Sequence, residues 1–185
     1  MLAIKNLKSG NGGMNEKRPD FKGNYPHSLD DKGRLTLPSP LREELFHSSV
    51  LSDRLYLNGF PANKHLTLYT FEMWNQASEN WSRDDSYPNS VVKDAAKRLF
   101  FANVEMVNLD KAGRILIPTS YREKIGVDLG QKIIVNGVGD RIELWSPADY
   151  ETNQLSDLEI WRAAQELEKR RSEENGAPAF RLPLC

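Results

Sequence analysis

Cysteine is almost absent from this chain: the only one among 185 residues is Cys185. A single cysteine cannot form a disulfide within the chain or a site with several thiolate ligands, so we expect an intracellular, reducing compartment. No segment approaches the length of a membrane-spanning helix, and Met1–Asp20 lacks the continuous apolar run of a secretory signal. We therefore predict a cytoplasmic protein with no membrane partner.

Sequence patterns typical of enzymes and metal sites are also missing. The histidines, His27, His47 and His65, are scattered and lack the short helical spacing typical of zinc ligands. There is no Gly-rich phosphate loop, nucleophile elbow or Ser/His/Asp order. The acidic pairs Asp30-Asp31 and Asp84-Asp85 fall in expected turns, where exposed carboxylates are ordinary. We predict no enzyme activity, no cofactor, no metal and no small-molecule substrate.

An excess of positive charge is the third absence. The chain has 25 Lys plus Arg against 26 Asp plus Glu, a net charge of -1. A DNA-binding domain is usually basic, so any attraction to phosphate must come from a local patch. The length and the 39% hydrophobic content are enough for a sizeable core in one or two domains.

The most informative feature is an internal repeat. The segment Leu29–Pro38 reads LDDKGRLTLP, and 80 residues later Leu109–Pro118 reads LDKAGRILIP. A looser match, 76 residues apart, follows between Leu66–Tyr69 and Ile142–Trp145. The chain therefore contains two modules of one design.

Each module is predicted to contain a strand, an Asp-x-x-Gly turn, a second strand, a short helix and a hairpin. The aspartate can cap backbone N–H groups of the turn, and the glycine tolerates positive φ. The expected strands are 25–29, 35–37, 54–58 and 65–69 in the first module and 104–109, 115–117, 132–135 and 141–145 in the second.

Local signals place the helices and the last hairpin. Ser39 with Pro40 is typical of a helix start, and Ser120 with Glu123 has capping-box spacing. The segment Asn136–Asp140 is expected to connect two strands as a hairpin turn. Helices are also predicted at 91–101, after a loop at 82–90, and from Pro147 to about Asn175.

The expected organisation follows from these elements. It comprises an extension at 1–22, a first module at 24–71, a linker loop and helix at 82–103, a second module at 104–148, a C-terminal helix at 149–175 and a flexible tail at 176–185. In the C-terminal helix the candidate buried positions are Leu155, Leu158, Trp161 and Leu167. The tryptophans Trp74, Trp81, Trp145 and Trp161 are expected to fill the core or subunit interfaces.

The two Asp-x-x-Gly-Arg turns, each followed by an apolar strand, a proline and a short helix with Arg-Glu, resemble the MraZ family of AbrB-like (SpoVT-AbrB) transcription factors. Arg98–Phe101 and Asn136–Trp145 add to the resemblance, which covers roughly Gly23–Leu155. It implies a mixed α+β, mainly β fold. In that fold, duplicated swapped-hairpin (double-split β-α-β) modules form one pseudo-two-fold barrel with linker and C-terminal helices.

The resemblance also implies a function. Proteins of this family regulate the division and cell wall gene cluster, usually as repressors. They bind direct repeats in promoter DNA as ring-shaped homo-oligomers, commonly of eight subunits, which would place this chain on the nucleoid. A ring would also explain how a chain without net positive charge binds DNA, because several weak contacts reinforce one another.

Carried over by residue, the family motif assigns DNA binding to Arg34 and Arg114. The turn scaffold is then formed by Asp30, Gly33, Asp110 and Gly113, and the phosphate-seeking lysines are Lys32 and Lys111. A planar guanidinium can donate two hydrogen bonds to a guanine edge or a phosphate. On a rigid glycine turn it has little entropy left to lose.

Alternatives remain open for these residues. The turns can be purely structural, with Arg34 or Arg114 pairing with a surface carboxylate. Arg42-Glu43 and Arg122-Glu123 are expected to be structural, through salt bridges across subunits or helix capping. Two other functions compete: an AbrB-type antitoxin, which the duplication disfavours, and a ring-forming scaffold that binds no DNA.

Overall fold

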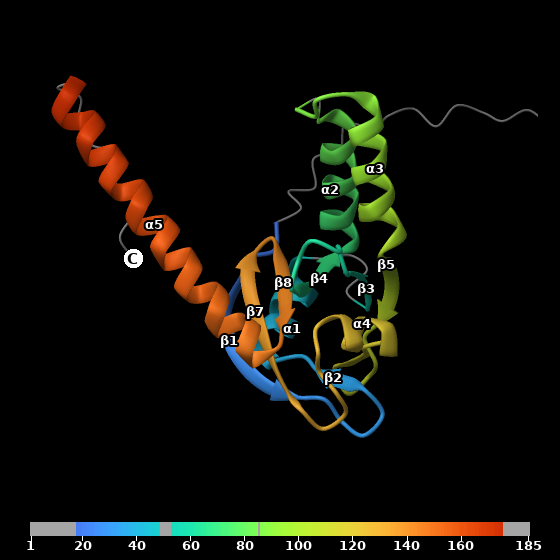
Figure 1. Ribbon diagram of the computed structural model, residues 1–185. Coiled ribbons are helices and arrows are strands. Elements are labelled where there is room, and N and C mark those ends of the chain that lie inside the picture. Colours follow the sequence, from blue (N-terminus) through green and yellow to red (C-terminus); the bar gives the residue numbers. More distant parts are fainter. Residues whose placement is uncertain (1–17, 49–52, 85, 176–185) are drawn as a thin grey trace, which may run out of the picture.

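The chain forms a six-stranded antiparallel sheet and a separate two-stranded one (Figure 1). The computed structural model describes residues 18–48, 53–84 and 86–175. The strands are β1 (Phe21–Ser28), β2 (Arg34–Thr36), β3 (Arg54–Asn58), β4 (His65–Thr70), β5 (Val104–Asn108), β6 (Arg114–Leu116), β7 (Lys132–Gly139) and β8 (Arg141–Trp145). The helices are α1 (Ser39–Ser48), α2 (Phe71–Arg83), α3 (Ser90–Ala102), α4 (Thr119–Lys124) and α5 (Pro147–Asn175). The segments 1–17 and 176–185 of the expected extension and tail lie outside the described residues.

The two modules exchange strands. In the large sheet the order is β1-β7-β8-β4-β3-β5, so β1 of the first module pairs with β7 of the second, and β5 of the second pairs with β3 of the first. The small sheet pairs β2 with β6. The order reads the same from either end when the modules are exchanged, which gives the fold a pseudo-two-fold axis. The predicted mixed α+β, mainly β fold with two swapped modules is confirmed.

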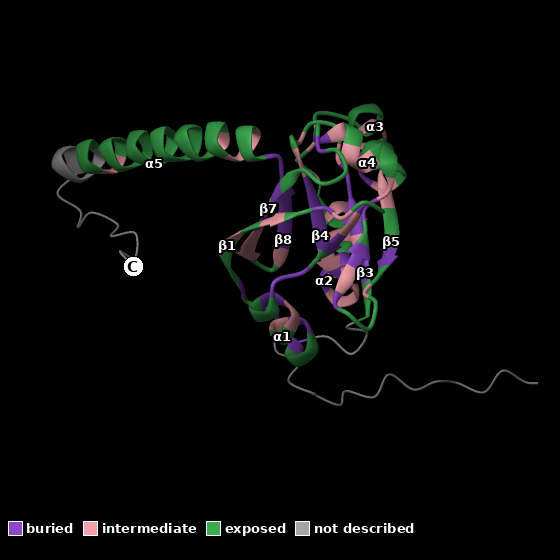
Figure 2. Ribbon diagram, turned by 90° about the horizontal axis from the view of Figure 1, so that it is seen from below, coloured by how far each residue is buried: buried purple, intermediate pink, exposed green. Residues whose placement is uncertain are grey.

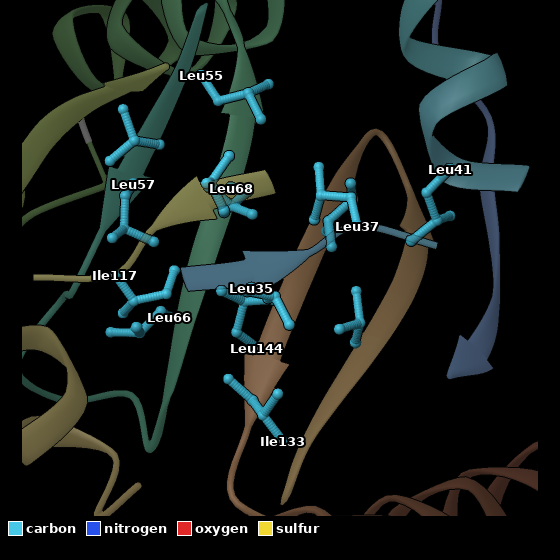
Figure 3. Packing of buried hydrophobic residues seen from close by; sticks show 14 of the residues in the cluster. Leu35, Leu37, Leu41, Leu55, Leu57, Leu66, Leu68, Ile117, Ile133 and Leu144 are labelled. Atoms are coloured by element: carbon cyan, nitrogen blue, oxygen red, sulfur yellow. The ribbon is translucent and has the colours of Figure 1, made fainter. Parts of the chain in front are cut away.

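One apolar core joins the two modules. It receives alternate residues from both sheets and the inner faces of α1 and α4. Leu35 of β2 and Ile115 of β6 are fully buried, and Figure 3 shows Leu35 lying beside Leu144 of β8. Because residues of both halves pack in the same cluster, the modules are parts of one folding unit.

Several boundaries differ from the prediction. Strand β1 begins at Phe21, whose side chain is buried, inside the segment expected to be an extension. Strand β7 continues to Gly139 through residues expected to form a hairpin turn. At Gly137 the backbone of β1 passes so close that a Cβ atom would lie 2.6 Å from the Lys22 nitrogen, so this glycine serves close strand packing. The capping box of Ser120 is wrong: α4 begins at Thr119, and no side chain caps it.

Helix α2 was not predicted. Thr70 caps it by accepting a hydrogen bond from the backbone N–H of Met73, and α2 lies beside α3 at one end of the molecule (Figure 1). Trp74 and Trp81 both stack on Phe100 of α3, with ring centroids 5.1 and 4.8 Å apart. The two helices therefore form an aromatic subcluster outside the main core.

Helix α5 projects away from the sheets, and its surface is exposed along most of its length (Figures 1 and 2). Its 29 residues span about 43 Å. The expectation that its apolar residues are buried is wrong within this chain, since Leu155 is 61% and Leu167 62% exposed. Trp145, by contrast, is buried as expected. None of the helices in the described ranges is long and apolar enough to cross a membrane.

Candidate nucleic-acid interface

The first Asp-x-x-Gly turn is organised by one carboxylate. Oδ1 of Asp30 accepts hydrogen bonds from the backbone N–H groups of Lys32 (2.9 Å) and Arg34 (2.8 Å). Oδ2 accepts from Nε of Arg34 at 2.7 Å. These hydrogen bonds lower the pKa of Asp30 to about 2, and the bond from the Arg34 backbone has the largest effect. Gly33 closes the turn at φ +75°, a conformation that L side chains rarely adopt.

The second turn repeats this arrangement. Oδ1 of Asp110 accepts from the backbone N–H groups of Ala112 and Arg114, both at 2.9 Å. Oδ2 accepts from Nε of Arg114 at 2.8 Å and forms an ion pair with its Nη2 at 2.7 Å. The side-chain hydrogen bond is the main reason that the pKa of Asp110 is lowered. Gly113 also has φ +75°. The sequence correctly assigned both the capping aspartates and the positive-φ glycines.

Each arginine thus pairs with the aspartate of its own turn, which is the contact that the purely structural alternative requires. The pairs are not buried: 30% of the Arg34 side chain and 33% of the Arg114 side chain are exposed. Arg34 pairs with its aspartate through Nε, 2.7 Å from Asp30 Oδ2. Because a guanidinium carries five N–H donors, the pair orients each arginine and still leaves donors for a second acceptor.

The two turns lie close together. Strands β2 and β6 pair with Arg34 opposite Leu116 and Thr36 opposite Arg114. The hydrogen bond to Asp110 is the main cause of the raised pKa of Arg114, and burial opposes this rise. The negative charge of Asp30, in the other turn, also raises the pKa of Arg114. The structure therefore brings the two arginines onto one two-stranded ribbon, defined here as β2 and β6.

The lysines are exposed at the turns but occupy different places. Lys32 is the third residue of its turn, whereas Lys111 is the second residue of its own. The position equivalent to Lys111 holds Asp31 in the first turn. The charged residues of the first turn therefore cancel, and those of the second sum to one positive charge.

Arg42 and Arg122 have a role that the sequence did not reveal. Arg42 of α1 packs against Gly113 in the other module, where a Cβ atom would overlap its guanidinium. Arg122 of α4 lies against Gly33 in the same way, with Nε 3.1 Å from where a Cβ would be. Both arginines also bond to the first residue of their own helix, through Ser39 Oγ and Thr119 Oγ1. Within this chain each of the two arginines therefore braces the turn of the opposite module, and the salt bridges expected across subunits stay a prediction.

A second polar cluster lies beside the start of α5. Glu143 is 7% exposed and accepts hydrogen bonds from Arg141 Nε (3.0 Å) and Trp145 Nε1 (3.1 Å). His65 Nε2 lies 3.8 Å from the same carboxylate, and burial lowers the pKa of His65. These groups line a cavity of about 770 Å³ between β7, β8 and α5. In the described ranges no group of three or more His, Cys, Asp or Glu residues could hold a metal ion.

Comparison with known proteins adds to this geometry. The chain matches the family described as "MraZ protein, putative antitoxin-like" over residues 21–90 and 100–171. A transcriptional regulator MraZ of Syntrophomonas wolfei is 34% identical over 142 residues, covering 75% of this chain and 92% of the relative. One from Mycoplasmoides gallisepticum is 38% identical over 133 residues, covering 71% and 84%. One from Caldicellulosiruptor saccharolyticus is 34% identical over 150 residues, covering 80% and 96%.

Proposed function

Because this chain belongs to the MraZ family, we propose that it is a transcriptional regulator that binds double-stranded DNA through the two Asp-x-x-Gly-Arg turns. The finer proposal has three parts: it represses the division and cell wall gene cluster, it recognises direct repeats in the promoter, and it acts as a ring homo-oligomer of about eight subunits. It is then a cytoplasmic, nucleoid-associated protein and not an enzyme.

The observation that carries this proposal is the pair of oriented guanidinium groups on one exposed ribbon. Asp30 and Asp110 fix Arg34 and Arg114 at defined positions, so little side-chain entropy is lost on binding. The donors that remain can reach a guanine edge or phosphate oxygens. The lysines at the turns supply attraction to the phosphate backbone.

Helix α5 supports self-association. Five of its large apolar residues are more than 40% exposed: Leu155, Leu158, Ile160, Trp161 and Leu167. A helix of this length gains most of its stability from packing, and α5 packs against the body only near its start. Contacts between subunits would bury this surface.

The decisive experiment compares R34A/R114A with R34K/R114K and with R98A, an exposed arginine of α3, in gel shifts on the promoter of the protein's own gene cluster. We expect R34A/R114A to abolish binding. R34K/R114K should retain weak binding, because lysine keeps the charge but not the planar fork. R98A should bind as the wild type does. Unchanged binding by R34A/R114A would contradict the proposed site.

Two further measurements separate the remaining candidates. Light scattering of R34A/R114A should show the wild-type oligomer, which excludes misassembly as the cause of lost binding. Titration of DNA with one repeat and with two repeats should show much tighter binding to two. If the wild type assembles but binds no DNA, the protein is a scaffold; equal affinity for one and two repeats removes the multivalent ring.

A further inference from the structure

The outer face of the ribbon carries two residues that the family motif does not include. Residues alternate between the two faces of a strand. Leu35 and Ile115 point inward and are fully buried, so Arg34, Thr36, Arg114 and Leu116 share the outer face. Thr36 is exposed, and Leu116 is 55% exposed. The two arginines occupy diagonal corners of this face, and the large apolar side chain of Leu116 is exposed at a third corner, opposite Arg34.

Thr36 and Leu116 are equivalent positions in the two modules. The pseudo-two-fold axis exchanges Arg34 with Arg114 and Thr36 with Leu116, and the exposure pattern from 31 to 37 is the same as that from 111 to 117. The pairing places Arg34 opposite Leu116 and Arg114 opposite Thr36. The ribbon thus has two arginines at equivalent backbone positions, one with an apolar neighbour across the ribbon and one with a hydroxyl neighbour.

Resting on the proposed function, we propose that the outer face of the ribbon enters the major groove, where Leu116 and Thr36 contact base edges beside the arginines. The major groove admits a two-stranded β-ribbon. An exposed leucine matches the C5-methyl group of thymine, and a threonine hydroxyl can donate to or accept from a base edge. Leu116 and Thr36 are then specificity-determining residues.

This arrangement gives the DNA site a direction. A palindrome offers two equal half-sites, which cannot both fit ends as different as Arg34–Leu116 and Arg114–Thr36. The turns also differ in charge, with Asp31 in one and Lys111 in the other, and this difference makes the two ends less alike still. An asymmetric DNA element repeated in one orientation fits such a ribbon. An inverted pair of elements would present every second subunit with a reversed element.

The test is selection from random double-stranded DNA, with wild type, L116T, T36L and the exchange variant T36L/L116T. We expect L116T to lose preference for thymine at one position and to bind the wild-type site about five- to tenfold more weakly. L116T and T36L make the ribbon neighbours alike, so both should shift selection toward symmetric elements. M106T, an exposed apolar residue of edge strand β5, is the matched control and should select the wild-type sequence.

The outcomes separate this inference from the proposed function. If all the variants select the wild-type sequence with affinity within twofold, while R34A/R114A still abolishes binding, the ribbon neighbours do not read bases and only this inference fails. If the wild type selects no DNA, both fail. Thermal melting of each variant checks folding; a fully folded L116T with an unchanged motif overturns the inference.

Discussion

Removing the turn lysines should lower the salt dependence of DNA binding by a calculable amount. Lys32 and Lys111 are exposed and can reach phosphates, whereas the arginines are held by their aspartates for the base edges. Each phosphate neutralised contributes about −0.9 to the slope of log K against log salt concentration. K32A/K111A should therefore reduce the slope by about 1.8 for each subunit that engages DNA.

The number of repeats changes the expected result. On DNA with one repeat the slopes of wild type and K32A/K111A should differ by about 1.8, and on DNA with two repeats by about 3.6. Between 50 and 200 mM salt, the larger difference means that the wild type loses about 150-fold more affinity than the variant. Fluorescence anisotropy over a salt series measures both slopes directly.

The matched control is K97A, an exposed lysine on α3 at the end of the molecule opposite the turn that leads into β2 (Figure 1). Its slope should equal that of the wild type. If K32A/K111A and K97A give the same slope, the lysines do not contact phosphate and the placement of DNA at the turns is wrong. A difference of about 1.8 on two-repeat DNA would show that only one subunit engages.

Three further outcomes concern stability. Gly113→Ala should destabilise the protein by more than the roughly 1–2 kcal/mol of a positive-φ substitution, because the added Cβ atom also meets Arg42. Urea unfolding should show a smaller loss of stability for Gly130→Ala, whose Cβ atom would meet no neighbour within 4 Å. Equal losses for the two variants would contradict the brace. Burial lowers the pKa of His65, so the unfolded chain binds its proton first and stability should fall as the pH drops below about 6.5. The fall should be smaller in His65→Gln, and identical pH profiles would refute this. Leu35→Ala should cost about 2–5 kcal/mol in urea unfolding, and a loss below 1 kcal/mol would be incompatible with its full burial.

Local chemistry made much of the fold predictable. An aspartate four residues before an arginine, with glycine between them, specifies its turn through hydrogen bonds that span only five residues. This is why both turns and the strands that flank them were correct. The partners of those strands are set by contacts far apart in the sequence, and nothing in the pattern of β1 indicates that it pairs with β7 of the other module.

The same distinction explains the errors. The predicted hairpin between β7 and β8 exists, but its turn is only Gly139-Asp140, with Gly139 at φ +65°, and not the whole segment 136–140. Gly137 lies inside β7, where the close approach of β1 leaves no room for a Cβ atom. The apolar residues of α5 are exposed, although their spacing predicts burial. Spacing shows that the residues can pack on a partner, but it does not show that the partner lies within this chain. The contact of Arg42 with Gly113 joins residues 71 positions apart, and no local signal could have predicted it.

The crossed braces tie the two halves of the coding sequence to each other. Arg42 lies against the bend that presents Arg114, and Arg122 against the bend that presents Arg34. A substitution in α1 or α4 therefore affects the proposed DNA-contacting turn of the other module. The two modules are therefore not independent copies, because a substitution in the helix of one module alters the turn of the other.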